Sequence, residues 1–282
     1  MIARDVLARR AVTEALRLRR RHGRSLEDPI CPIDLALHEG VDVRLEPVSS
    51  LEGMYTPDVP AIVLGSLRPR GRRAFTCAHE LGHHVFGHGF RIDELLDDGA
   101  SADATDDAEF AADRFAAALL MPKLAVLHAF DLRSWPIASC TAEQAFIVAG
   151  LFGVGYTTLV GYLAGTLHVI TRSTSDELRK QAPKATRARI AGRDCPRGLV
   201  IVDDWWSGRP VDAEVGDLVL LPAGASASSN VMQHVSGCLF TATAPGAGRV
   251  HREAWELPVR VARANYSGLA TYRHLEEVDD DV

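Results

Sequence analysis

Apolar and polar residues in the first part of the chain recur with the periods of helices and short strands. Residues 41–45 switch at every position between an apolar and a charged side chain, and this period of two predicts a half-buried strand. The apolar run 61–64 predicts a second strand. Helical spacing, with start and stop signals such as Pro32 and Gly40, predicts helices over about residues 2–22, 32–40, 74–87 and 104–120. A basic loop is expected over residues 68–73.

The second part of the chain has a different pattern. Residues 141–165 are expected to be helical, and the charged stretch 176–193 is interpreted as a domain boundary. Beyond it, short apolar runs separated by Gly, Pro and Ser predict strands over 198–203, 217–221, 237–242 and 259–262. We therefore expect an α+β protein with three parts: an α+β domain over 1–125, a helical extension and linker over 126–190, and a smaller, mostly β C-terminal domain of unknown role over 191–282.

The third predicted helix contains the segment His79-Glu80-Leu81-Gly82-His83. Residues four apart share one face of a helix, so the two imidazoles can hold a single metal ion. Glu80 can take a proton from a water at that metal, because zinc lowers the pKa of such a water toward neutrality. Gly82 is unfavourable inside a helix by about 1 kcal/mol relative to alanine, which predicts that another helix packs closely there. Two histidines on a polar helix face are the alternative interpretation.

A third ligand is expected from the next helix. Zinc hydrolases generally use three protein ligands and leave one position for water. Glu109 and Asp113 are four apart and share a face. We expect Glu109 to bind the metal and Asp113 to accept a hydrogen bond from the other ring nitrogen of a ligand histidine. Asp106, Asp107 and Asp113 itself are alternative ligands, and a solvated acidic face is the alternative interpretation.

Composition narrows the class of protein further. Of the 282 residues, 47% are hydrophobic and 24% are charged, as in ordinary globular chains. The five cysteines are scattered and form no CxxC pair, which argues against a thiolate zinc site and favours free thiols in a reducing cytoplasm. The chain shows neither a signal peptide nor a transmembrane run of apolar residues, so a cytoplasmic protein that does not contact membranes is expected.

Residues 145–163 resemble a helix-turn-helix unit of the kind that binds DNA. The net charge of the chain is -6, and no lysine or arginine occurs between Thr141 and His168. Because neutralisation of phosphates supplies most non-specific affinity for DNA, direct DNA binding by this unit is disfavoured. We interpret it as a packing unit or as a surface that docks a partner protein.

Two longer segments together resemble the ImmA/IrrE family of bacterial zinc metallo-endopeptidases. They are Phe75–His83 and Ala112–Pro122, and with weaker matches around Pro32 and Val41 the resemblance covers about residues 10–165. It implies a compact zincin-like metallopeptidase domain with one Zn²⁺ per chain, for which Mn²⁺ is an alternative. Carried onto this chain, the ligands are His79, His83 and Glu109, and Glu80 is the catalytic base. Asp113 stands where many members have asparagine, and we expect this departure to leave metal binding intact.

The same resemblance implies limited proteolysis of a regulatory protein, a helix-turn-helix transcriptional repressor that controls a mobile element or a stress response. The substrate peptide is expected to lie along an exposed strand edge, for which residues 61–64 are the candidate. Tyr55, His88 and Arg114 are candidates for contacting substrate or stabilising the oxyanion. The alternative is a metal-dependent binding module that displaces a repressor without cleavage. The intact Glu80 favours the enzyme, since binding alone needs no base beside the metal.

Overall fold

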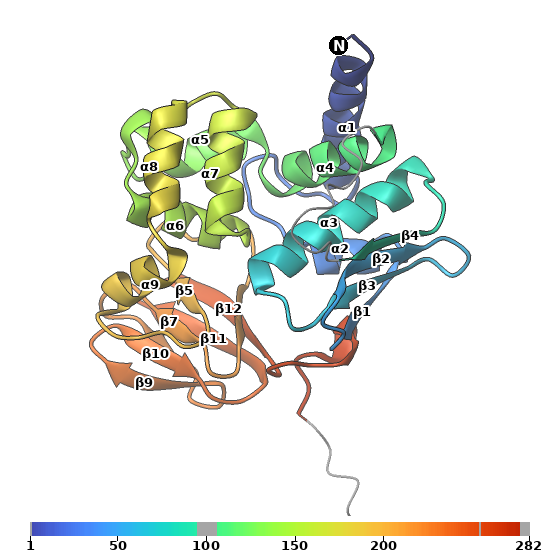
Figure 1. Cartoon of the computed structure of the whole chain (residues 1–282). Helices are drawn as coiled ribbons and strands as arrows, with labels where there is room; N and C mark the ends of the chain where they lie inside the picture. The colour runs from blue at the N-terminus through green and yellow to red at the C-terminus, as the bar shows by residue number, and fades with distance from the viewer. Residues whose placement is uncertain (1, 95–105, 254, 277–282) are drawn as a thin grey trace, which may run out of the picture.

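A computed structural model describes residues 2–94, 106–253 and 255–276 and shows a mixed α and β architecture (Figure 1). The N-terminal half is built on a five-stranded sheet with the order β13-β1-β3-β2-β4. In this sheet β1 and β3 are parallel, and the other neighbours are antiparallel. The strands are β1 (Asp42–Glu46), β2 (Leu51–Thr56), β3 (Ala61–Gly65), β4 (Arg91–Glu94) and β13 (Gly268–Leu269).

Helices cover this sheet in successive layers (Figure 1). α3 contacts β2, β3 and α4, and α4 in turn contacts α1. Leu81 of α3, Ile62 of β3 and Phe115 of α4 are fully buried in one hydrophobic core. The helices of this half are α1 (Ile2–Arg21), α2 (Pro32–His38), α3 (Arg70–Phe86) and α4 (Asp107–Leu120).

The α3 helix is fixed at its end and along its length by two glycines. Gly87 adopts the left-handed conformation with φ 66°, and the N–H groups of Gly87 and His88 donate to the carbonyls of His84 and His83. This is the paired hydrogen-bond pattern of a glycine-terminated helix. A Cβ on Gly82 would lie 3.1 Å from Ala112 Cα, so α4 packs directly on Gly82. The close helix packing predicted at Gly82 is therefore confirmed.

The middle of the chain is helical and leads into two further sheets. Its helices are α5 (Lys123–Asp131), α6 (Ala142–Phe152), α7 (Tyr156–Gly165), α8 (Arg172–Lys180) and α9 (Pro183–Ala191), with short 3₁₀ turns at Ile137–Ser139 and Ala270–Tyr272. α6 begins with a capping box formed by Thr141 and Gln144, and α7 follows it at an angle of 102°. Within the described residues, no single helix is long and apolar enough to cross a membrane; only the bent α6–α7 pair, taken together, passes that test.

The last part of the chain forms two four-stranded sheets with the orders β5-β7-β10-β9 and β6-β12-β11-β8. Its chain then returns to the first half, where β13 pairs with β1 (Figure 1). The division of the chain into three domains stays a prediction. The strands are β5 (Leu199–Ile201), β6 (Val211–Glu214), β7 (Leu218–Leu220), β8 (Ser226–Ala227), β9 (Met232–Ser236), β10 (Leu239–Ala242), β11 (Gly246–Arg252) and β12 (Trp255–Ala262).

Two expectations about local structure need correction. Residues 61–64 do not form a sheet edge, because β3 lies between β1 and β2; the edges are β4 and β13. The basic segment 68–73 is a loop only up to Pro69, since α3 begins at Arg70. The charged stretch 176–193 contains most of α8 and all of α9, and its interpretation as a domain boundary stays a prediction. The start expected for α4 at 104 lies outside the described residues, and Asp106 caps the helix.

Candidate metal centre

His79 and His83 lie one turn apart on the buried face of α3. His79 is 7% exposed and His83 is fully buried, and their Nε2 atoms are 3.0 Å apart. Two ring nitrogens this close repel each other unless a proton or a metal cation lies between them. The helix therefore presents two nitrogen donors to one point.

Glu109, in the first turn of α4, brings a carboxylate oxygen to the same point. Its Oε2 lies 3.1 Å from His79 Nε2 and 3.5 Å from His83 Nε2. The alternative ligands are engaged elsewhere: Asp106 caps α4 by accepting from Ala108 N, and Asp107 lies 3.8 Å from Arg4. The close packing of α3 and α4 at Gly82 is what places Glu109 over the two histidines.

The spacing of the three donor atoms fits a tetrahedral zinc ion. Zinc binds histidine nitrogen and carboxylate oxygen at about 2.0–2.1 Å, so two ligand atoms of a tetrahedron are separated by roughly 3.3 Å. The three separations here, 3.0, 3.1 and 3.5 Å, surround that value. Within the described part of the chain, His79, His83 and Glu109 are also the group whose ligand atoms all lie within 4.8 Å of one another.

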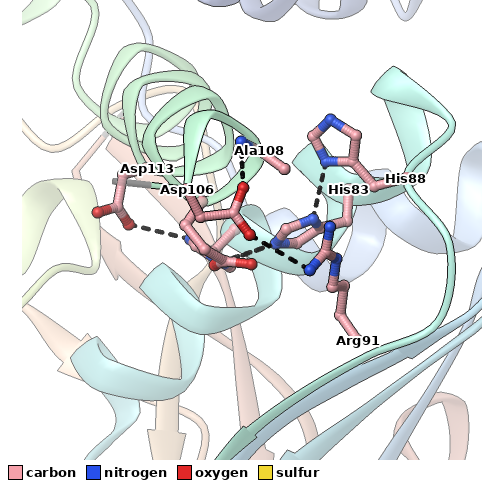
Figure 2. Close-up of polar contacts among 8 residues, drawn as sticks. His83, His88, Arg91, Asp106, Ala108 and Asp113 are labelled. Atoms are coloured by element: carbon pink, nitrogen blue, oxygen red, sulfur yellow. Dashed lines mark hydrogen bonds and ion pairs between the residues drawn. The ribbon is translucent and has the colours of Figure 1, made fainter. Parts of the chain in front are cut away.

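The second ring nitrogen of each histidine has its own partner. His79 Nδ1 lies 2.9 Å from Asp113 Oδ1, one turn after Glu109 on α4. His83 Nδ1 lies 2.9 Å from Nδ1 of His88, which lies just beyond the end of α3, and a dashed line joins these two rings in Figure 2. Such contacts fix the ring orientation and the tautomer, which leaves both Nε2 atoms available for a metal.

The electrostatics of the group favour a positive charge at its centre. Burial lowers the pKa of His79, but hydrogen bonds with Asp113 and Glu109 outweigh it and raise that pKa to about 10. Hydrogen bonds from His79 and, next in size, from His83 hold the pKa of Glu109 far below its usual range. A divalent cation would supply this positive charge in place of the proton.

Glu80 is fully buried beside His79, and it faces the sheet at Gly53 of β2. A Cβ on Gly53 would lie 2.5 Å from Glu80 Oε1 and 2.4 Å from Thr76 Cγ2. Glycine at this strand position therefore makes room for the carboxylate. Gly53 is not among the residues predicted from the sequence. A glycine inside a strand signals close approach by another group, but no strand is predicted over residues 51–56.

The structure separates the three candidates for contacting substrate. Tyr55 is buried, and its hydroxyl lies 2.9 Å from His84 Nδ1. Arg114 donates to Thr166 Oγ1 at 3.0 Å and stacks on Phe110. His88 contacts the ligand pair through His83 and stacks on Phe86. Of the three, only His88 contacts the candidate metal group, and its contact is with the ring of His83.

The metal group opens into a large cleft. A cavity of about 1530 Å³ is lined by His79, Glu109 and Asp113, by Ile92 of the edge strand β4, and by residues from α6, α7, α9 and the C-terminal sheets. Ile92 is 48% exposed on that edge. The edge strand β4 and the metal group therefore line the same cleft.

Residues 36–160 match the model of the peptidase M78 family, described as the IrrE N-terminal-like domain. This match spans the sheet, the metal group and the α6–α7 unit. Among solved structures, a Mycobacterium tuberculosis transcriptional regulator is 22% identical with a TM-score of 0.37, over 57% of this chain and 50% of that one. The match thus spans half the length of that structure. No curated protein matches the chain.

Proposed function

This chain belongs to the ImmA/IrrE family, and from that membership we propose that it is a zinc-dependent endopeptidase that cuts a regulatory protein at limited sites. The observation that supports the proposal most strongly is the convergence of His79, His83 and Glu109 within 4.8 Å of one another, next to the buried carboxylate of Glu80. A site that only bound metal would need no carboxylate beside the first ligand.

In this proposal some residues bind or orient the metal ligands, and one residue transfers the proton. We assign His79, His83 and Glu109 to the metal, and Asp113 and His88 to orienting the two imidazoles. Zinc, when bound, acts as a Lewis acid and makes water acidic enough to react near neutral pH. Glu80 accepts the proton of the attacking water and then gives it to the leaving amine nitrogen, so that one carboxylate serves as base and then as acid.

Strand β4 is the edge along which the substrate would lie. Among the described residues β4 pairs with β2 alone, and its Ile92 lines the cleft together with His79. An extended peptide that adds to this edge would have its backbone hydrogen-bonded and its carbonyls directed toward the metal group. This arrangement, a metal helix packed on β2 and β3 of a sheet whose edge strand β4 runs antiparallel to β2, is the zincin-like geometry that we propose for the domain.

The substrate that the family resemblance suggests is a helix-turn-helix transcriptional repressor. The absence of lysine and arginine from residues 141–168 supports a protein partner over direct DNA contact by α6 and α7. All five cysteines are free thiols, which fits action in a reducing cytoplasm.

Metal analysis combined with a mobility-shift assay tests the proposal. We expect about one zinc per chain in the wild type, and less than a tenth of that in Glu109→Ala and His83→Ala. A repressor encoded beside this gene should lose its DNA only with the metal-loaded protein and should appear as two fragments. Loss of DNA binding with the repressor still intact would instead establish the alternative, displacement without cleavage.

A further inference from the structure

The cleft that contains the metal group has a charge opposite to that of the whole chain. The chain has a net charge of -6, yet nine arginines and six carboxylates line the cavity. Two of these carboxylates, Glu109 and Asp113, belong to the metal group. The rest of the lining therefore has nine arginines against four carboxylates, and this positive charge attracts a negatively charged ligand.

Most of the lining arginines are paired. Arg70 lies 3.0 Å from Asp217, Arg72 lies 2.6 Å from Glu52, and Arg73 pairs with Glu214. Three others, Arg187, Arg197 and Arg209, form no ion pair with any residue in the described ranges. Arg187 lies in α9, and Arg197 and Arg209 directly precede β5 and β6. We call these three residues the arginine end of the cleft.

Two members of the arginine end have buried donors without acceptors. The Nε atoms of Arg187 and Arg209 are both shielded from solvent and have no hydrogen-bond partner among the described residues. A buried N–H without an acceptor is costly, and a guanidinium group binds carboxylates and phosphates with particular strength. Burial also lowers the pKa of Arg209, which shows that nearby carboxylates do not fully offset the cost of burying its charge.

Two of these arginines are held against glycines. The guanidinium group of Arg209 lies over the Trp206 ring, 5.4 Å from its centroid, and a Cβ on Gly153 would lie 2.3 Å from Arg209 Nη1. The side chain of Arg197 lies in the same way along Gly216. These contacts fix Arg209 beside the turn between α6 and α7.

One helix connects the arginine end to the metal group. The turn at Gly155 lies on Gly71, in the first turn of α3, where a Cβ would lie 2.6 Å from Gly155 N. Arg72, Thr76 and His79 all line the cavity and follow one face of α3. His79 comes eight residues after Gly71, which is about 12 Å along a helix axis. An extended peptide spans that distance with about four residues.

We propose that the arginine end selects substrates that carry an acidic segment about four residues from the bond to be cut. The inference rests on the proposed function, since it assigns a specificity to the same cleft. Asp or Glu side chains of the substrate would accept from Arg187, Arg197 and Arg209 while the backbone reaches the metal group along β4. Charge complementarity of this kind contributes chiefly to selectivity and to the rate of association.

A binding measurement that needs no cleavage tests this proposal. The probes are two fluorescent peptides of roughly twelve residues, long enough to span the cleft. One contains a run of glutamates, and the other has glutamines at the same positions. Fluorescence anisotropy with the zinc-loaded, full-length Glu80→Gln protein should show at least tenfold tighter binding of the acidic peptide. Arg187→Gln/Arg209→Gln in that background should reduce this preference to less than twofold.

The matched control removes the same charge from the outer surface. Arg172 and Arg193 are exposed and do not line the cavity, so Arg172→Gln/Arg193→Gln should retain the full preference. Equal loss in both double variants would overturn the proposal, because it would show attraction to net charge alone. If circular dichroism shows that Arg209→Gln is unfolded, the exposed Arg197→Gln replaces it, with a loss of at least threefold expected.

Two further outcomes separate this inference from its premise. If the acidic peptide binds selectively but the wild type cuts neither peptide nor repressor, proteolysis is refuted and acidic selection stands. If the wild type cuts the repressor while both peptides bind alike, acidic selection is refuted and proteolysis stands. Protection of the wild type by pyrophosphate in thermal unfolding, without any peptide preference, would overturn the proposal in favour of a small phosphorylated ligand.

Discussion

At the residue scale, the site depends on side chains that are absent as much as on those that are present. Gly53 leaves the space that Glu80 occupies, and Gly82 leaves the space through which α4 brings Glu109 over the histidines. A carboxylate buried as completely as Glu80 has few positions open to it, since displacement into apolar surroundings is costly. The position of Glu80, the proposed base, is therefore set by strand β2.

Gly53→Ala should move Glu80 without removing a metal ligand. The added methyl would approach Oε1 to 2.5 Å, so the carboxylate or β2 must shift. We expect at least a tenfold fall in kcat with zinc content unchanged, because misplacement of a base by about 1 Å has effects of this size. Gly165→Ala, where an added Cβ meets nothing within 4 Å, is the control. Equal activity in the two variants would show that Gly53 does not position the base.

Asp113 should act as an acceptor rather than as a charge. Its Oδ1 lies 2.9 Å from His79 Nδ1, a contact that asparagine can also make through its carbonyl oxygen. Asp113→Asn is expected to retain zinc affinity within about threefold, and Asp113→Leu to lose about 10- to 100-fold. Chelator competition measures both, with the exposed Asp107→Leu as control. Equal affinity in Asp113→Leu and wild type would remove Asp113 from the site.

At the element scale, the contact between α3 and α4 brings Glu109 of α4 to the two histidines of α3. Gly82→Val would force Cβ and its methyl groups against Ala112 and Phe115, which cannot give way within a packed core. We expect a loss of about 1–3 kcal/mol in the free energy of unfolding together with weaker zinc binding. Gly165→Val, with open space around it, should leave zinc affinity unchanged. Weakened stability with unaltered zinc affinity would mean that the helix contact does not set the ligand geometry.

The sequence predicts elements better than it predicts their neighbours. The alternating residues 41–45 and the helical spacing around His79 are local signals, and the structure contains β1 and α3 there. The order of strands is a long-range property, which is why residues 61–64 seemed to be an edge although β1 and β2 flank them. β13 is two residues long and pairs with a strand more than 200 residues earlier, so no local pattern predicts it. β2 was missed because its buried positions do not alternate.

The candidate site follows a similar division. Two histidines four residues apart on a helix share one face, so spacing alone predicts that His79 and His83 lie together. The meeting of α4 with α3 cannot be predicted from spacing, although Gly82 indicates that another helix packs closely on α3. His88 gave no clear signal of its contact with His83, because the contact depends on the left-handed turn at Gly87.

At the scale of the whole molecule, partly buried ion pairs connect the C-terminal sheets to helix α2 of the N-terminal half. Asp34 of α2 accepts from Arg260 at 2.8 Å and from Arg273 at 3.3 Å, and Arg260 also contacts Asp212. Breaking such a network leaves charges without partners in a partly buried place. The two halves should therefore unfold together.

Asp34→Ala should weaken that connection. We expect a loss of about 2 kcal/mol in the free energy of unfolding, less than for a fully buried pair because Asp34 is partly exposed. Glu256→Gln, which breaks an exposed pair with Arg249, should change it by about 0.5 kcal/mol or less. Urea unfolding measures both variants when it is followed by two probes. Tryptophan fluorescence reports the second half, which holds Trp135, Trp205, Trp206 and Trp255, and far-ultraviolet circular dichroism also reports the helices of the first half. Two separate transitions in the wild type would contradict the coupling of the two halves.

The central claim is that Glu80 makes a zinc centre into a peptidase. Its most direct test is intact-mass spectrometry of a helix-turn-helix repressor after incubation with zinc-loaded wild type or zinc-loaded Glu80→Gln. We predict two fragments with the wild type, whose masses add up to the repressor plus one water, and intact repressor with Glu80→Gln at equal zinc content. Equal cleavage by both proteins, or cleavage by neither with full zinc occupancy, would contradict the claim.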